Sequence, residues 1–182
     1  MSEREHLILT RDVATVTIPD GAIGSLAKGE EVTIHQALGD NYTVITAYGH
    51  MVRIAGCDAD ALGKERPQTA ALVNDVDAQA VEQNCWEVMK TVYDPEIPVN
   101  IVDLGLVYSC TVEAIGDAAH KVDITMTLTA PSCGMGPVIQ NDVDKAIRAL
   151  QGVAEVYVEL VLDPPWSQEH MSEVAKLQLG LY

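Results

Sequence analysis

The stretch that decides the fold is residues 106–129, which read LVYSCTVEAIGDAAHKVDITMTLT. On each side of Gly116-Asp117, apolar residues alternate with polar ones, and this period of two is typical of strands with one buried face. We therefore predict two antiparallel strands, residues 106–114 and 121–129, joined by a hairpin turn. The side chains predicted to face inward are Leu106, Tyr108, Cys110 and Val112 on the first strand, and Val122, Ile124, Met126 and Leu128 on the second.

The sequence on either side of this hairpin predicts two helices that would cover one of its faces. Asp77 can cap a helix whose apolar residues recur at helical spacing as far as Pro95, before which the backbone leaves the α region. A second helix is predicted over residues 137–150, with a proline at its first position and Gly152 just after its end. Both helices carry an apolar stripe, which packing on a sheet requires.

A third strand and a third helix complete this part of the chain. Residues 153–162 alternate again, and the side chains predicted to face inward are Ala154, Val156, Val158, Leu160 and Leu162. After two prolines, Ser167 can cap a last amphipathic helix that reaches about residue 179. The order α-β-β-α-β-α predicts a two-layer α+β domain over residues 77–182, with the helices on one face of a three-stranded sheet.

Residues 1–63 have a different pattern, short strand-like runs separated by turn residues such as Pro19-Asp20-Gly21. Runs of this length at about ten-residue spacing predict a small β-rich, barrel-like domain. Residues 64–76 are polar, contain a proline and keep no period, so we predict a linker there. The prediction is therefore two domains, residues 1–63 and 77–182, joined by that linker.

The composition excludes several classes of partner. The chain has 27 acidic and 11 basic residues and a formal charge of −16, so it lacks the basic surface that nucleic-acid binding requires. No apolar run reaches transmembrane length without a charge, and an anionic membrane surface would repel the protein. Four cysteines without a Cys-x-x-Cys pair, and an N-terminus without a leader pattern, predict a reducing, cytoplasmic location.

A loop rich in carboxylates precedes the hairpin. Residues 94–105 read DPEIPVNIVDLG and contain Asp94, Glu96 and Asp103 together with two prolines. Because prolines restrict the backbone, these carboxylates would be held in place, as a functional site needs. A helix stop followed by a turn with solvated acids explains the same residues, and the pattern alone leaves both interpretations open.

A second loop carries the cysteine best placed for chemistry. Residues 129–137 read TAPSCGMGP and put Cys133 just before a predicted helix. The unpaired N–H groups and positive dipole of a helix N-terminus favour a thiolate, which is a nucleophile and a soft-metal ligand. A small cysteine that fills space is the alternative. Packing is the expected role of Cys85 and Cys110, and Cys57, beside two aspartates, is expected in a solvated turn rather than at a metal.

The two loops should meet, because the start of the first hairpin strand and the end of the second lie at the same end. Asp103 and Cys133 are therefore expected to approach each other, with the carboxylates positioning the cysteine or helping to bind iron. Trp166, which follows two prolines, is predicted to anchor the last helix onto the domain.

Three separated motifs carry a resemblance to a known family. They are YDPEIPVNIVDLGLVY at residues 93–108, TAPSC at residues 129–133 and DPPW at residues 163–166. In this order they resemble the metal–sulfur cluster biosynthesis family of iron–sulfur assembly proteins, over about residues 77–182. Many members have proline after the motif cysteine, whereas Gly134 follows it here. That difference and the preceding β-rich domain are similar to the SufT branch.

The resemblance implies a maturation factor rather than an enzyme, acting with the iron–sulfur assembly machinery and with recipient iron–sulfur proteins. The site residues that it implies are Asp94, Glu96, Asp103, Thr129 and Cys133. Among them, Cys133 would be the reactive thiol of transfer, and Cys133 with Glu96 would contact a transient iron or iron–sulfur cluster. One thiol cannot hold a four-cysteine cluster, so a homodimer or a partner's ligands would have to complete such a site.

The residues themselves are also compatible with two other functions, those of an enzyme and of a metal-free adaptor. In an enzyme, Cys133 would be a nucleophile and Asp94 or Glu96 an acid–base group, although no histidine lies near either motif. In a metal-free adaptor, the acidic surface would dock on basic partners, and a cysteine in a loop at a helix start would have no role.

Overall fold

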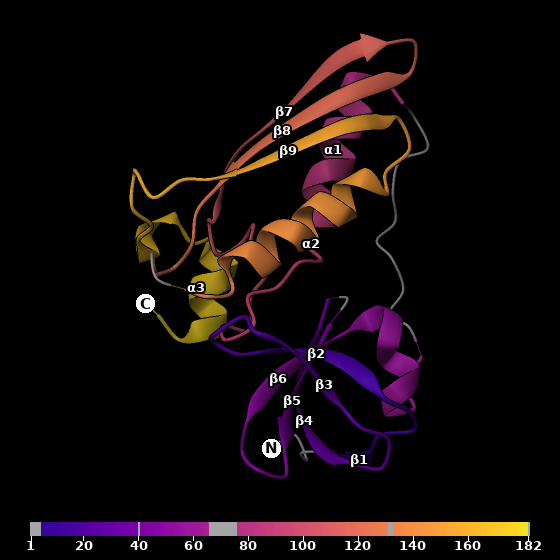
Figure 1. Cartoon of the computed structure of the whole chain (residues 1–182). Helices are drawn as coiled ribbons and strands as arrows, with labels where there is room; N and C mark the ends of the chain where they lie inside the picture. The colour runs from indigo at the N-terminus through magenta and orange to yellow at the C-terminus, as the bar shows by residue number, and fades with distance from the viewer. Residues whose placement is uncertain (1–4, 40, 66–75, 131–132, 182) are drawn as a thin grey trace. The chain divides into compact units, whose positions relative to one another are not determined.

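The computed structural model describes residues 5–39, 41–65, 76–130 and 133–181. The chain divides into two compact units (Figure 1). The first unit is Met1–Thr69 with Pro95–Pro98, and the second is Ala70–Asp94 with Val99–Tyr182. Most of the linker predicted at residues 64–76 lies outside the described residues.

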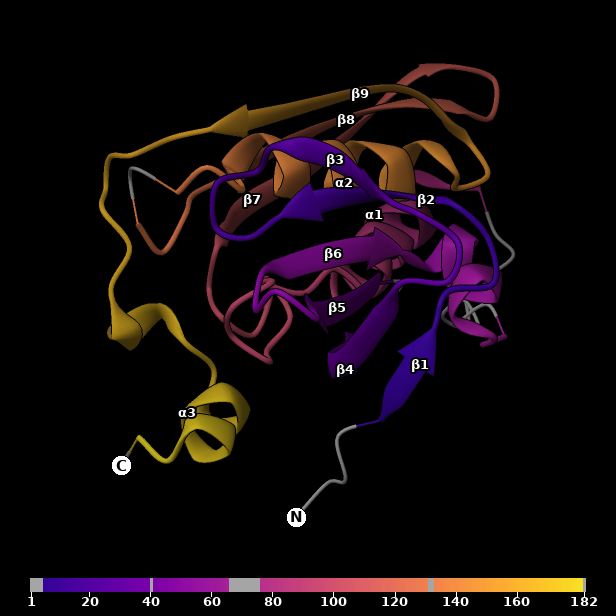
Figure 2. The ribbon, with the colours of Figure 1, turned by 60° about the horizontal axis from the view of Figure 1, so that its bottom comes forward.

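The first unit is built on one antiparallel sheet with the strand order β1-β4-β5-β6-β2-β3. Its elements are β1 (His6–Ile8), β2 (Val13–Thr17), β3 (Ile23–Leu26), β4 (Glu31–Leu38), β5 (Asn41–Thr46), β6 (Met51–Ala55) and the 3₁₀ helix η1 (Gly56–Leu62). Figure 2 looks onto this sheet, with β4, β5 and β6 in its middle. Among the described residues the order ends at two short strands, β1 and β3, so the sheet is open there rather than a closed barrel.

The core of the first unit follows from the alternation of its strands. Val32, Val44 and Ile54 come from three neighbouring strands and are all nearly inaccessible to water. η1 adds small and apolar side chains to the same cluster, including Ala61 and Leu62. Burial of apolar side chains of this kind contributes about 1.5–3 kcal/mol for each large residue, so this small unit has a core of its own.

The second unit has the predicted order of elements. They are α1 (Ala78–Met89), β7 (Val107–Gly116), β8 (Ala119–Met126), α2 (Gly136–Arg148), β9 (Val153–Leu160), η2 (Gln168–His170) and α3 (Glu173–Leu179). The sheet order is β7-β8-β9, with β7 antiparallel and β9 parallel to the central β8. In Figure 1 and Figure 2, α1 and α2 lie along the same side of this sheet.

The central strand β8 shows most clearly why this unit folds. Every second residue of β8 is buried, and Val122, Ile124 and Met126 are at most 1% exposed. They share the core with buried side chains of both helices, such as Met89 of α1 and Ile139 of α2. The inward face predicted for the hairpin is confirmed, although Tyr108 and Val112 of β7 are half-buried rather than buried.

The first predicted helix is shorter than the sequence indicates. Asp77 caps it as predicted, its side chain accepting from the Ala80 N–H at 2.7 Å. The helix ends at Met89, however, so Pro95 is not what stops it. The hydroxyl and N–H of Thr91 both donate to the Val88 carbonyl, at 2.7 and 3.0 Å, and so tighten the last turn.

The C-terminal predictions need two corrections. β9 ends at Leu160, and two residues predicted to face inward, Ala154 and Leu162, are exposed, because the helices cover only the middle of that strand. The single helix predicted from Ser167 is also divided. Ser167 caps only η2, and α3 starts at a second cap, where the Ser172 side chain accepts from the Ala175 N–H at 3.1 Å.

The free edge of β9 is covered by side chains of α2. The Gln140 side-chain amide donates to the Val158 carbonyl at 2.6 Å, and the Arg148 guanidinium donates to the Val156 carbonyl at 3.0 Å. These bonds take up carbonyls that an edge strand would otherwise present to another chain. Within the described ranges, no helix is long and apolar enough to cross a membrane.

We expect a fragment of residues 74–182 to fold by itself, because its sheet and helices have a core of their own. The measurement is far-UV circular dichroism with thermal unfolding, which should show native helix content and one cooperative transition. The full chain serves as the control. An unfolded fragment beside a stable full chain would contradict the predicted independence of the two domains.

Candidate functional site

The loop between α1 and β7, residues 90–106, carries the predicted carboxylates, and we call it the carboxylate loop. Its first part is a tight turn: Tyr93 and Asn100 form an antiparallel bridge, and the Asp94 N–H donates to the Val99 carbonyl at 3.3 Å. Asp94 is only 4% exposed, at the base of this turn. Glu96 is exposed and belongs to Pro95–Pro98, which groups with the first unit.

Asp103 is held by a neighbour that the sequence analysis did not single out. The side-chain amide of Asn100 donates to Asp103 Oδ2 at 2.6 Å, and the Asp103 N–H donates to Asn100 Oδ1 at 2.8 Å. The sequence does contain a signal for this pair, the spacing Asn-x-x-Asp. At this spacing the asparagine side chain can cap the turn that carries the aspartate. The Asp103 carboxylate therefore has a fixed direction.

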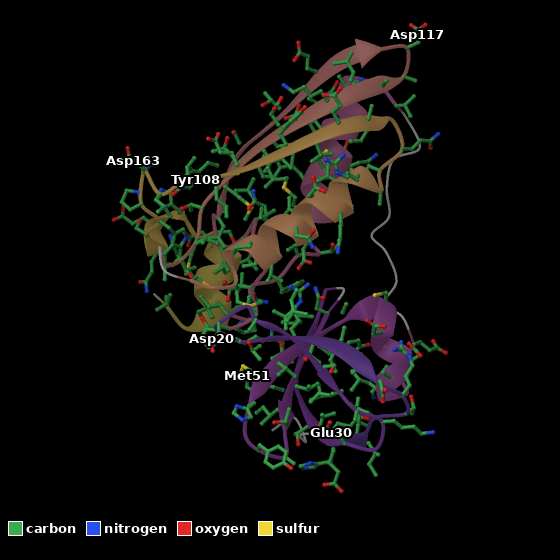
Figure 3. The ribbon with its side chains drawn as sticks, in the orientation of Figure 1. Asp20, Glu30, Met51, Tyr108, Asp117 and Asp163 are labelled. Atoms are coloured by element: carbon green, nitrogen blue, oxygen red, sulfur yellow. The ribbon has the colours of Figure 1, made fainter. Side chains whose placement is uncertain are left out.

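The chain between β9 and α3 holds the carboxylate loop from outside. We call residues 163–172 the C-terminal segment. The Trp166 indole N–H donates to the Leu104 carbonyl at 2.8 Å, and the Tyr108 hydroxyl donates to the Pro164 carbonyl at 2.8 Å. In Figure 3, Tyr108 and Asp163 lie at the end of the sheet opposite the hairpin turn that Asp117 marks. Trp166 is thus an anchor, as predicted, but its hydrogen bond goes to the carboxylate loop.

Two further contacts complete this attachment. The Ser172 N–H donates to the Asp103 carbonyl at 2.8 Å. Gly105 has a left-handed backbone, with φ of 72°, and lies directly against the backbone of His170. Only glycine combines this conformation with so close an approach, so the glycine of the motif is required by packing.

The second loop leaves the hairpin at the same end. We call residues 127–135 the cysteine loop, and two of them, Pro131 and Ser132, lie outside the described residues. The Thr127 N–H donates to the Leu106 carbonyl at 2.8 Å, so this loop starts beside the end of the carboxylate loop. The structure therefore brings the loops of Asp103 and Cys133 to one end of the sheet, as predicted.

Cys133 is half-buried, and its backbone is part of the start of α2. The N–H of Gly136 donates to the Cys133 carbonyl at 3.2 Å, and those of Val138 and Ile139 donate to the Met135 carbonyl at 3.0 and 2.9 Å. The first N–H groups of the helix are therefore already bonded, unlike the unpaired donors that the sequence led us to expect. The described part of the chain provides no acceptor for the N–H groups of Gly134 and Met135, which follow the cysteine directly.

The last of the predicted site residues is Thr129. Thr129 is half-buried in the cysteine loop, four residues before Cys133.

In the first unit, Arg11 donates to Asp58 at 2.8 Å and to Asp60 at 2.6 and 2.7 Å. Its guanidinium lowers the pKa of Asp60 below the usual value, mainly through these hydrogen bonds. The aspartates beside Cys57 thus bind an arginine.

The described residues show no ready-made metal site near Cys133. Among the described residues, no three His, Cys, Asp or Glu side chains lie together in a group that could hold a metal ion. A thiolate at Cys133 would bind iron through sulfur, and a carboxylate could add oxygen.

Comparison with known proteins agrees with these motifs. A family profile described as iron-sulfur cluster assembly protein matches residues 82–159, which lie in the second unit and include both loops. An Fe-S protein maturation auxiliary factor of Porphyromonas gingivalis is 44% identical over 99 residues, 54% of this chain and 90% of that protein. The Fe-S protein maturation auxiliary factor SufT of Staphylococcus aureus is 38% identical over 90 residues, 50% of this chain and 98% of that protein.

A solved structure is similar as well. The crystal structure of a domain of unknown function from Bacillus anthracis matches with a TM-score of 0.52 and 39% identity. The match covers 58% of this chain and 96% of that structure. The resemblance drawn from the three motifs is therefore confirmed, and the mixed helix–sheet architecture agrees with a solved relative.

Replacing Gly105 by alanine should destabilise the protein by about 2–4 kcal/mol, because the new methyl group would combine left-handed strain with overlap of the His170 backbone. Chemical denaturation measures this difference. Gly180→Ala is the matched control, since Gly180 has a similar φ of 70° with open space around it, and it should cost only about 1 kcal/mol. If the two substitutions lowered the free energy of unfolding equally, the close approach of Gly105 to the His170 backbone would not explain the requirement for glycine.

Cys133 should alkylate fastest of the four thiols at neutral pH. It is partly exposed and followed by two N–H groups for which the described residues provide no acceptor, whereas Cys85 and Cys110 are buried. Cys57 is exposed, but its thiol donates to the Asp58 carboxylate at 3.7 Å, a contact that a thiolate would lose. Brief treatment with iodoacetamide followed by mass mapping gives the order. If Cys57 were labelled faster than Cys133, the inference that the cysteine loop makes Cys133 the most reactive thiol would be wrong.

Proposed function

This chain belongs to the family of iron–sulfur cluster assembly proteins, and we propose that it matures iron–sulfur proteins through a reactive thiol at Cys133. In this role it assists the assembly of a cluster or its transfer to recipient proteins. One observation carries the proposal: the only half-exposed thiol of the chain lies in the cysteine loop, beside a carboxylate loop that is held rigidly.

Iron or an iron–sulfur cluster is cargo in this proposal. Cys133 supplies one soft sulfur ligand, too few for stable binding of a cluster but suited to a transient contact during transfer. The N–H groups of Gly134 and Met135 would donate to the sulfur and stabilise its negative charge. Further ligands would come from the assembly machinery, from a recipient or from a second copy of this chain.

The carboxylates divide into two roles. Asp94 is buried and Asp103 is bonded to Asn100, so both position the carboxylate loop. Glu96 is exposed in the turn, and in this proposal its carboxylate contacts iron, while Thr129 helps to shape the cysteine loop. Loss of Glu96 should therefore weaken the function rather than end it.

The proposal includes no catalysed reaction. No histidine lies next to Cys133 in the sequence, and the Asp103 carboxylate already accepts a hydrogen bond from the Asn100 side chain. An acid–base partner for a nucleophilic cysteine is thus not evident in the described loops. The charge of −16 favours protein partners with basic surfaces, and the free thiols suit a reducing compartment such as the cytoplasm.

In cells that lack the gene for this chain, Cys133→Ser should fail to restore the activity of recipient iron–sulfur enzymes. Serine keeps the shape of the side chain but is a poor ligand for iron. Glu96→Gln should restore most of the activity. Cys57→Ser, at an exposed thiol of the other unit, is the matched control and should restore all of it.

The same variants separate a thiol-dependent role from a metal-free adaptor. Anaerobic incubation with iron and sulfide should give absorbance of bound cluster with wild type and with Cys57→Ser, and little with Cys133→Ser. Circular dichroism must show that each variant is folded. Full activity of Cys133→Ser in cells would overturn the assignment and favour the adaptor.

A further inference from the structure

The sheet of the second unit has one face that its helices leave open. In Figure 1 and Figure 2, α1 and α2 lie along one side of β7, β8 and β9. The side chains on the other side alternate with the buried ones and are exposed or half-buried. We call this surface the outer sheet face; it consists of Ser109, Thr111 and Glu113 of β7, Lys121, Asp123 and Thr125 of β8, and Glu155, Tyr157 and Glu159 of β9.

The outer sheet face carries more negative charge than it balances. Four of its nine residues are acidic and one, Lys121, is basic. The strand register puts Lys121 between Glu113 and Glu155, and its ammonium group bonds to the Asp123 carboxylate at 3.0 Å. In the described part of the chain, Glu113, Glu155 and Glu159 form no ion pair. Three carboxylates of this face are therefore left without a cation.

These carboxylates also act on the one lysine among them. The hydrogen bond to Asp123 raises the pKa of Lys121 above its usual value, and the charges of Asp123 and Glu113 act in the same direction. Like charges on one sheet face repel each other and so destabilise the folded chain. A cation brought by another molecule would lower this repulsion.

Tyr157 adds an aromatic surface that suits a cation. This residue is 56% exposed, and Lys121 Nζ already lies 5.2 Å from the centre of its ring. The face of such a ring attracts ammonium and guanidinium groups at this distance. Residues of β8, β9 and α2, Asp123 and Glu159 among them, line a hollow of about 650 Å³ beside Tyr157. The hollow thus offers an incoming basic side chain one ring and two carboxylates.

We propose that the outer sheet face is a docking surface for a partner protein that presents lysine or arginine side chains, one of which lies over Tyr157 beside Glu159. Charge complementarity selects this partner, since nucleic acids and anionic membranes have the same sign of charge as the face. A second copy of this chain, with its charge of −16, would be repelled too. The inference goes beyond the proposed function, because it involves no thiol and holds whether or not Cys133 binds iron.

The test measures binding of a basic probe, fluorescein-labelled hexa-arginine amide, to the full chain by fluorescence anisotropy. Glu155→Gln combined with Glu159→Gln should raise the dissociation constant about fivefold, because two exposed charge pairs are lost. Tyr157→Leu keeps the charge and removes the ring, and it should raise the dissociation constant about threefold. Binding by wild type should weaken as the salt concentration increases.

The matched control is Glu31→Gln combined with Glu82→Gln. Both residues are exposed and lie outside the outer sheet face, so this variant has the same net charge as the first one. It should change the dissociation constant by less than about twofold. Equal losses in the two double variants would mean that the peptide responds only to the overall charge of the chain. That result, or an unchanged dissociation constant for Tyr157→Leu, would overturn the proposal.

A second measurement locates the peptide on the wild-type chain, so that the answer does not depend on the folding of a variant. In ¹H–¹⁵N correlation spectra, unlabelled hexa-arginine amide should shift the amide signals of β8 and β9 most, including those of Lys121, Asp123 and Tyr157. Shifts spread evenly over both units, or confined to other elements, would contradict the docking surface. Circular dichroism checks that each variant in the anisotropy series is folded.

Discussion

The hydrogen bond from the Thr127 N–H to the Leu106 carbonyl, 2.8 Å long, is the constraint on which the site depends. Both residues are at most 1% exposed, so water cannot replace the bond, and losing it would leave two buried polar groups without partners. It closes the open end of the β7–β8 hairpin and sets where the two loops emerge. The carboxylate loop ends at this bond and the cysteine loop begins there.

The other contacts of the site build on that closed end. The C-terminal segment donates to the carbonyls of Asp103 and Leu104, three and two residues before Leu106. Within the loop, the Asn100 side-chain amide donates to the Asp103 carboxylate. These bonds account for backbone and side-chain groups that an irregular loop would otherwise leave to water. The end of the carboxylate loop is therefore held by hydrogen bonds from the C-terminal segment and from Asn100.

Burial gives the four cysteines three different kinds of chemistry. Cys57 is exposed beside Asp58, a residue that is itself bound by an arginine. Cys85 of α1 and Cys110 of β7 are buried in the core, so access to both thiols is limited. Cys133 is half-buried just before α2, so its thiol is partly accessible. The same residue type thus serves separate purposes because the fold gives each copy its own surroundings.

The sequence by itself determined what depends on local pattern: the strands of the hairpin, the cap of α1 at Asp77, the proline in the first turn of α2, and the motifs that identify the family. The end of α2 was not among them, because the helix stops at Arg148, before the predicted glycine Gly152. Only the tertiary structure decided where α1 stops, how Ser172 starts a separate α3, and which groups hold the carboxylate loop. The bond from Trp166 to Leu104 joins residues 62 positions apart, and the bond from Tyr108 to Pro164 joins residues 56 positions apart. Periodicity and capping act within a few neighbouring residues, whereas such partners are chosen when the elements pack, so no local pattern announces them.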